Sequence, residues 1–113
     1  MTMYRIVFSE MVKEEIDDAY NYIKEKLNNP IAAEKMIAQI REKLDYIEEN
    51  PYVWSLAKDF HLSLLGVRFF RIKNYLLFYV IDEEKKIAKL SRFLYGHSDW
   101  VSILHEDFSE EDI

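Results

Sequence analysis

The stretch LGVRFFRIKNYLLFYVIDEEKKIAKLSRFLYGHSDW, residues 65–100, decides the fold of this chain. It contains three runs rich in aromatic and β-branched residues, at 65–72, at 75–82 and from 87 onward, separated by two short polar breaks. Runs of this composition predict an antiparallel meander of three strands. The middle run is apolar at both odd and even positions, which is typical of a central strand covered on both faces.

A short strand and two helices are expected before the meander. Residues 3–8 have a strand pattern, and Ser9 is placed to cap the helix that follows. Apolar residues then recur at steps of three and four over 10–27 and again over 31–49, which predicts two amphipathic helices. Because only the break at 28–30 separates them, the two helices should form an antiparallel hairpin.

The remaining segments complete an α+β fold class: an N-terminal strand, a helical hairpin, an antiparallel three-stranded meander and a short C-terminal helix. The first strand should pair beside the meander, since its backbone groups have no other partner. Residues 52–64 are interpreted as a connector packed along the core edge, and the last helix is expected from a cap at Ser98 to about His105. We expect residues 1–105 to form a single domain and residues 106–113 a flexible acidic tail.

The composition argues against several classes of protein. The chain has 113 residues, half of them hydrophobic, which is enough for one domain with its own core. It has no cysteine, only three separated histidines and no glycine-rich phosphate loop, so we expect no disulfide, metal or cofactor. No apolar run reaches the ~20 residues of a membrane-spanning helix, and no signal-peptide pattern opens the chain. We therefore expect a cytoplasmic protein without a membrane partner.

The net charge of −6 is distributed unevenly. Residues 1–60 carry 8 basic and 12 acidic side chains, residues 61–97 carry 7 and 3, and residues 98–113 carry none and 6. The strand region is therefore basic between two acidic regions, which is compatible with an anionic partner on the sheet. The alternative is that the basic side chains of the sheet pair with the acidic tail, which would then compete with such a partner.

Short motifs follow one another in a particular order from Tyr4 to Leu104. They are Tyr4-x-Ile6-x-Phe8-Ser9, Asp17-Asp18 with Tyr22-Ile23, Asn29-Pro30-x-Ala32-Ala33, Ile47-x-x-Asn50-Pro51, Gly66-Val67-Arg68, Tyr75-x-x-Phe78-Tyr79-x-Ile81-Asp82 and Arg92-Phe93-Leu94-Tyr95-Gly96-His97-x-Asp99-Trp100. In this order and spacing the motifs resemble the RelE/ParE family of toxins from type II toxin–antitoxin systems. The resemblance implies a small growth-inhibiting toxin that is held inactive by a cognate antitoxin encoded beside it.

The resemblance implies two kinds of target, because RelE-like members cut messenger RNA in the ribosomal A site whereas ParE-like members inhibit DNA gyrase. The RelE-like pattern has a basic residue directly after Gly-His and a tyrosine soon afterwards. Here Ser98 follows His97, no tyrosine follows Tyr95, and the ending Asp99-Trp100 is more similar to ParE relatives. This favours a toxin that binds gyrase. The alternatives are a ribosome-dependent mRNA endoribonuclease and a degenerate, non-toxic binding protein.

The nuclease alternative has four candidate catalytic residues. RNA cleavage without a metal needs a base, an acid and cations that stabilise the charge on the phosphate. The imidazole of His97 is a candidate acid or base, Tyr95 is able to donate a proton or stack on a base, and the forked guanidinium groups of Arg68 and Arg92 suit phosphate. The alternative for both arginines is an ion pair with carboxylates of the helices or the tail.

Other polar and aromatic residues are given structural interpretations. Arg71 and Lys89 are interpreted as charges at a sheet edge or face. The aromatic residues of the middle strand are interpreted as core: Tyr75, Phe78 and Tyr79. Acidic residues of the first helix are interpreted as a solvated face: Glu14, Glu15, Asp17 and Asp18.

Overall fold

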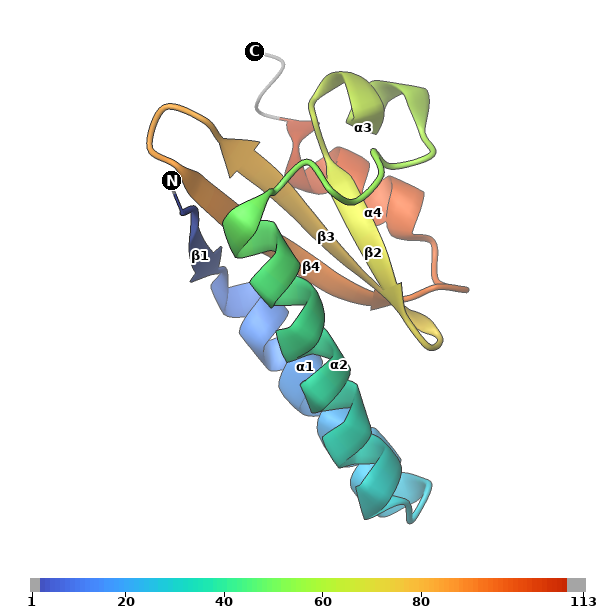
Figure 1. The fold of residues 1–113 in the computed structure, drawn as a ribbon. Coiled ribbons are helices and arrows are strands. Elements are labelled where there is room, and N and C mark those ends of the chain that lie inside the picture. The colour runs from blue at the N-terminus through green and yellow to red at the C-terminus, as the bar shows by residue number, and fades with distance from the viewer. Residues whose placement is uncertain (1–2, 110–113) are drawn as a thin grey trace.

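The computed structural model describes residues 3–109, which fold as a four-stranded sheet with helices on both faces (Figure 1). The predicted α+β fold class is confirmed. Its elements, in chain order, are β1 (Arg5–Phe8), α1 (Glu10–Asn21), a π-helical turn (Tyr22–Lys26), α2 (Pro30–Glu49), α3 (Phe60–Leu64), β2 (Arg68–Ile72), β3 (Tyr75–Asp82), β4 (Ile87–Tyr95) and α4 (Trp100–Asp107).

The sheet has the strand order β1-β4-β3-β2. Strands β2, β3 and β4 form the predicted antiparallel meander, and the first strand pairs beside it, parallel to β4, as expected. The register between β3 and β4 shifts after Phe78, which pairs with Arg92, because Tyr79 pairs with Leu90. Ser91 is therefore the extra residue of a β-bulge, and the residues on either side of it point to opposite faces of the sheet.

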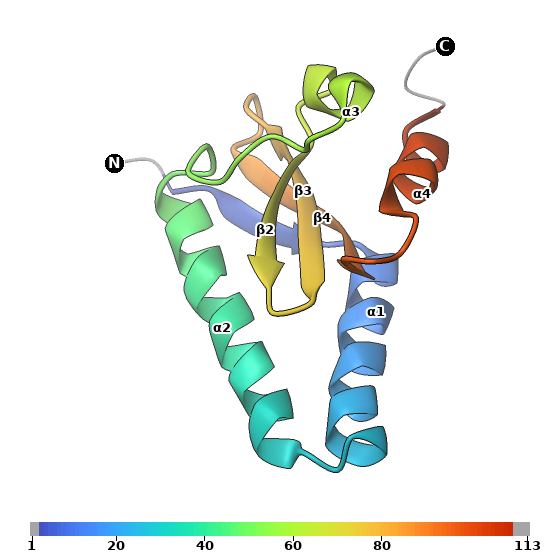
Figure 2. The same ribbon diagram turned by 90° about the vertical axis from the view of Figure 1, so that its right-hand side faces the viewer.

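Strand β3 is buried on both faces, as its continuous apolar run predicts. Leu77 and Tyr79 belong to a core that the sheet shares with α1 and α2, whereas Leu76 and Phe78 belong to a second core with α3 and α4. Figure 2 shows α2 on one side of the sheet and α4 on the other. The hairpin of α1 and α2 projects beyond the end of the sheet (Figures 1 and 2).

The helix ends follow the expected capping chemistry. The hydroxyl of Ser9 accepts a hydrogen bond of 3.0 Å from the N–H of Val12, and the side chain of Asn29 accepts one of 3.1 Å from the N–H of Ala32. Pro30, which lacks the N–H that a first helical turn leaves unpaired, begins α2. Both predicted helices are confirmed, with a π-helical turn at the end of the first.

The connector packs along the core edge as expected, through Trp54, Ala57 and Leu62. It also contains the short helix α3, which was not expected and is capped by Asp59, and Phe60 at the start of this helix is 79% exposed. A single helical turn is too short to show a hydrophobic period. The cap of α4 is Asp99 and not Ser98, because the hydroxyl of Ser98 donates to the carbonyl of Tyr95 at 2.6 Å.

Helix α4 continues to Asp107, two residues beyond the expected boundary, and Phe108 packs against the second core. The expected flexible tail therefore begins within a helix, and residues 110–113 lie outside the described part of the chain. None of the helices within residues 3–109 combines the length and the apolarity that crossing a bilayer requires.

Candidate functional site

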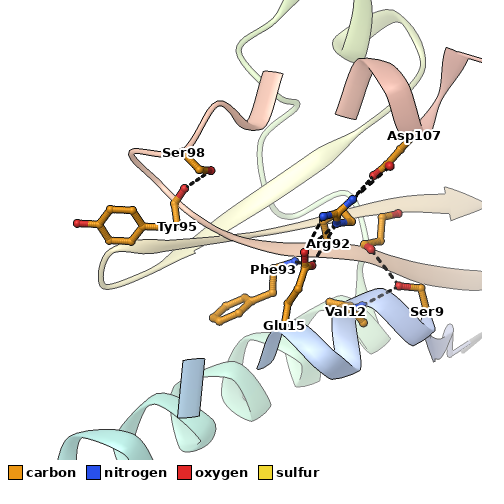
Figure 3. A network of polar contacts seen from close by, with 9 residues as sticks. Ser9, Val12, Glu15, Arg92, Phe93, Tyr95, Ser98 and Asp107 are labelled. Atoms are coloured by element: carbon orange, nitrogen blue, oxygen red, sulfur yellow. Dashed lines mark hydrogen bonds and ion pairs between the residues drawn. The ribbon is translucent and has the colours of Figure 1, made fainter. Parts of the chain in front are cut away.

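Arg92 is held between two helices by carboxylates (Figure 3). Its Nε and Nη2 donate to Glu15 of α1, with a shortest distance of 2.7 Å, and its Nη1 lies 3.1 Å from a carboxylate oxygen of Asp107 in α4. The side chains of Arg92 and Glu15 are only 13% and 18% exposed. Burial works against the charge, but the hydrogen bonds to Glu15 and the attraction of both carboxylates raise the pKa of the guanidinium above its usual value.

Glu15 also completes the edge of the sheet. Strand β1 ends at Phe8, opposite Leu90, so the N–H of Phe93 has no strand beside it on that edge. Glu15 accepts that N–H at 2.9 Å. The interpretation of Glu15 as part of a solvated face is therefore wrong, and the expected alternative for Arg92, an ion pair with the helices, is confirmed.

Arg68 lies on the opposite face of the sheet from Arg92. It pairs with Tyr79 in the β2–β3 register, whereas Arg92 pairs with Phe78, and adjacent residues of a strand point to opposite faces. Its Nη1 donates to the carbonyl of Trp54 at 2.7 Å, and its guanidinium lies 5.2 Å from the ring centre of Tyr52. Arg68 thus anchors the connector through carbonyl groups and not, as considered above, through a carboxylate.

The same connector is fixed by a buried tyrosine. The hydroxyl of Tyr79 donates to the carbonyl of Pro51 at 2.7 Å. Burial raises the pKa of Tyr79 to about 12, so the hydroxyl remains a donor throughout the physiological range. Arg68 and Tyr79 therefore hold the connector against β2 and β3 from neighbouring positions.

Tyr95 and His97 are the two candidates that lie close together. Their ring centres are 5.4 Å apart at the end of β4, and both side chains are exposed. Figure 3 shows the ring of Tyr95 pointing away from Arg92. The four candidate catalytic residues therefore do not converge on one phosphate-sized position: two lie together in solvent, and each arginine is engaged elsewhere.

A groove lies between the hairpin tip and the β2–β3 turn. This hairpin groove has a volume of about 680 Å³, and its walls include Tyr22, Leu27, Ala32, Met36, Tyr75 and Tyr95. Tyr22 and Leu27 are 50% and 55% exposed, which is high for apolar side chains in helical register with a core. The sequence shows that Leu27 continues the apolar period of the first helix. The period alone does not show that the helix extends beyond the end of the sheet.

The hairpin groove suits an apolar partner. Lys73 is the one charged residue among those that line it within the described chain. Grooves of this kind receive the apolar face of an amphipathic helix or the alternate side chains of an added strand. Within residues 3–109, no group of three or more histidine, aspartate or glutamate side chains is arranged to hold a metal ion.

Comparison with known proteins identifies relatives of this fold. The family model described as the ParE toxin of type II toxin–antitoxin system, parDE, matches residues 6–100. The chromosomal ParDE system of P. aeruginosa has a similar chain, with 15% identity, a TM-score of 0.63 and coverage of 82% of this chain and 96% of that one. A chain of the toxin–antitoxin complex RelBE2 of Mycobacterium tuberculosis is similar as well, with 16% identity and a TM-score of 0.58. The match covers 83% of this chain and 99% of that one. None of the curated proteins gives a significant match.

Proposed function

Because the chain belongs to the ParE toxin family of type II toxin–antitoxin systems, we propose that it stops growth by binding DNA gyrase and is neutralised by a cognate antitoxin. The observation that carries the choice of binding over RNA cleavage is the pairing of Arg92 with Glu15 and Asp107. A cation already neutralised by two carboxylates contributes little to the stabilisation of a phosphate transition state. A toxin that acts by binding needs no such group.

The arrangement of the other candidates supports the same choice. Cleavage needs an acid and a base within hydrogen-bond reach of one phosphate, with cations beside them. Tyr95 and His97 adjoin one another, which is the one observation that favours the RelE-like alternative. Arg68 is on the face of the sheet opposite Arg92 and is engaged by the carbonyls of the connector, so it does not supply the missing cation.

The activity test is the His97→Ala variant in cells. Under the proposal, induced expression of this variant arrests growth as strongly as the wild type at equal protein level, because no proton transfer is involved. A ribosome-dependent nuclease that uses His97 as acid or base would instead lose ~10²–10⁴-fold in rate, and toxicity would fall with it. Loss of toxicity in a variant that still folds, as shown by an unchanged unfolding midpoint, would contradict the proposal.

We place the antitoxin in the hairpin groove. The groove volume of about 680 Å³ and its exposed apolar walls match several side chains of a helix or strand supplied by a partner. Co-expression with the product of the neighbouring gene should give a stable complex. Leu27→Asp should weaken that complex. The same change at Leu64, an exposed leucine on α3 outside the groove, should leave it intact. Equal retention of the antitoxin by both variants would contradict this placement.

A further inference from the structure

A second hollow lies on the sheet face that α4 covers, at the edge of β2. This Arg71 cleft has a volume of about 260 Å³ and is lined by Lys58, Phe69, Arg71, Phe78, Gly96 and Trp100, among others. Its volume falls just below the ~300–1,000 Å³ of pockets that enclose whole small molecules. The cleft is therefore of a size to receive one large side chain from a partner.

The walls of the Arg71 cleft are aromatic. Phe78 is fully buried, and the ring centres of Phe69 and Trp100 lie 6.1 Å and 5.2 Å from it. Phe69 and Trp100 are themselves only half-buried, so each leaves part of an aromatic ring facing the hollow. Partly exposed aromatic residues around a small hollow are the kind of pocket that anchors a large apolar or aromatic side chain at interfaces.

Two cations stand beside these aromatic walls without a carboxylate partner among the described residues. Arg71 donates one long hydrogen bond, of 3.4 Å, to the carbonyl of Lys73, and Lys58 is exposed. By contrast, Arg68 and Arg92 are engaged within the fold. Of the three arginines on the strands of the meander, Arg71 is thus the one with an open guanidinium fork among the described residues.

Gly96 keeps the space beside that fork open. A Cβ at this position would lie 3.5 Å from Nη1 of Arg71 and 3.2 Å from the carbonyl oxygen of Asn74. The contact with Nη1 is of ordinary van der Waals length and the contact with the carbonyl is tight, so a side chain here would take up space beside the guanidinium and press on the β2–β3 turn. The N–H of Gly96 donates to the same carbonyl at 2.6 Å, which fixes the end of β4 against the turn.

We propose that the Arg71 cleft docks a short acidic segment of the target protein, with one large apolar side chain between Phe69 and Trp100 and carboxylates on Arg71 and Lys58. Nucleic acid is the less suitable anion, because polyanion binding draws on many cations, whereas the chain carries −6 overall and Asp99 is exposed next to Trp100. The inference rests on the proposed function, since it assigns the surface through which the target is bound.

The first test uses a defined probe and does not depend on the identity of the target. A short peptide of glutamate, aspartate and glycine with one central phenylalanine is titrated into the full chain, and the indole N–H of Trp100 is followed by NMR. Binding should shift the signals of Trp100, Arg71 and Gly96, and should weaken by about tenfold or more when the phenylalanine becomes alanine or Arg71 becomes glutamate. No binding, or shifts confined to other surfaces, would overturn the proposal, as would tighter binding of a matched oligothymidylate.

The second test uses purified gyrase. Arg71→Glu and Lys58→Glu should each weaken inhibition of supercoiling by about tenfold or more, whereas Lys85→Glu, the same charge reversal in the β3–β4 turn, should not. The Arg71→Glu and Lys58→Glu variants should retain the antitoxin, because the hairpin groove lies on the opposite face of the sheet from the Arg71 cleft. Equal inhibition by all variants would overturn the assignment of the cleft. If the wild type leaves gyrase active, the proposed target is wrong. The peptide titration then decides by itself whether the Arg71 cleft binds an acidic segment.

Discussion

Arg92 joins three elements that are distant in the sequence. The bulge at Ser91 turns the side chain of Arg92 to the face of the sheet that α4 covers, where Asp107 lies. Because β1 ends early, Glu15 reaches Arg92 around the edge of β4. A sequence pattern shows neither the bulge nor the edge, because a shift of one residue moves every later side chain to the other face. This explains why Arg92 was an open choice between ion pair and phosphate ligand.

Replacing Arg92 tests whether it is structural. Arg92→Met leaves Glu15 without its cation and should lower the free energy of unfolding by about 2–3 kcal/mol, somewhat below the ~3–5 kcal/mol of a fully buried pair. Urea unfolding measures the loss. Arg41→Met, the same change at an exposed site on α2, should stay within about 0.5 kcal/mol of the wild type. An Arg92→Met protein as stable as the Arg41→Met control would show that the guanidinium is free to serve a ligand.

Glu83 predicts how stability depends on acid. Lys86, Tyr52 and Tyr4 all donate hydrogen bonds to its carboxylate, and the pKa of Glu83 falls to about 2 from an ordinary value of 4.5. A lowered pKa in the folded state means that the contribution is complete above pH 4.5 and is lost as the pH falls toward 2. The stability difference between the wild type and Glu83→Gln, measured by unfolding at several pH values, should therefore shrink over this range. A difference independent of pH would show that the carboxylate charge is not involved.

Among the helices and strands, the sequence predicts the elements that have a repeated hydrophobic period and misses the features that have none. The two helices and the meander follow from periods of 3.6 and 2 sustained over many residues. Helix α3 has one turn, the cap of α4 is decided by which of two neighbouring polar residues bonds the turn before it, and the bulge is a single extra residue. The same limit applies to the candidate catalytic residues: Arg68, Arg92 and Tyr95 lie on strands, but the faces and partners of the candidates depend on irregular features that the sequence does not show.

The end of α4 yields a prediction about the domain boundary. We propose that the folded domain includes Asp107 and Phe108, since the first pairs with Arg92 and the second packs against the second core. A chain ending at His105 should lose about 1–3 kcal/mol of unfolding free energy relative to a chain ending at Ser109, from the loss of one partly buried aromatic side chain and one ion pair. Equal thermal unfolding of the two truncated chains would return the boundary to residue 105.

Across the whole molecule, we propose that the two faces of the sheet serve different partners. The hairpin face carries an apolar groove with one lysine, suited to an antitoxin segment, and the α4 face carries an aromatic cleft with two cations. The negative charge of the helices lies outside both hollows, as the uneven charge of the sequence suggests. An antitoxin segment in the hairpin groove does not by itself cover the Arg71 cleft. Neutralisation would then require that the bound antitoxin sterically excludes the target or that further segments of the antitoxin cover the cleft.

We propose that this chain acts by binding gyrase and not by cutting RNA. The most direct measurement adds the purified protein to purified gyrase and, separately, to ribosomes translating a defined message. We predict that supercoiling falls in proportion to the amount of protein until the two are equimolar, that antitoxin added beforehand restores it, and that the message stays intact. Unimpaired supercoiling together with cleavage of the message in the ribosomal A site would contradict this proposal.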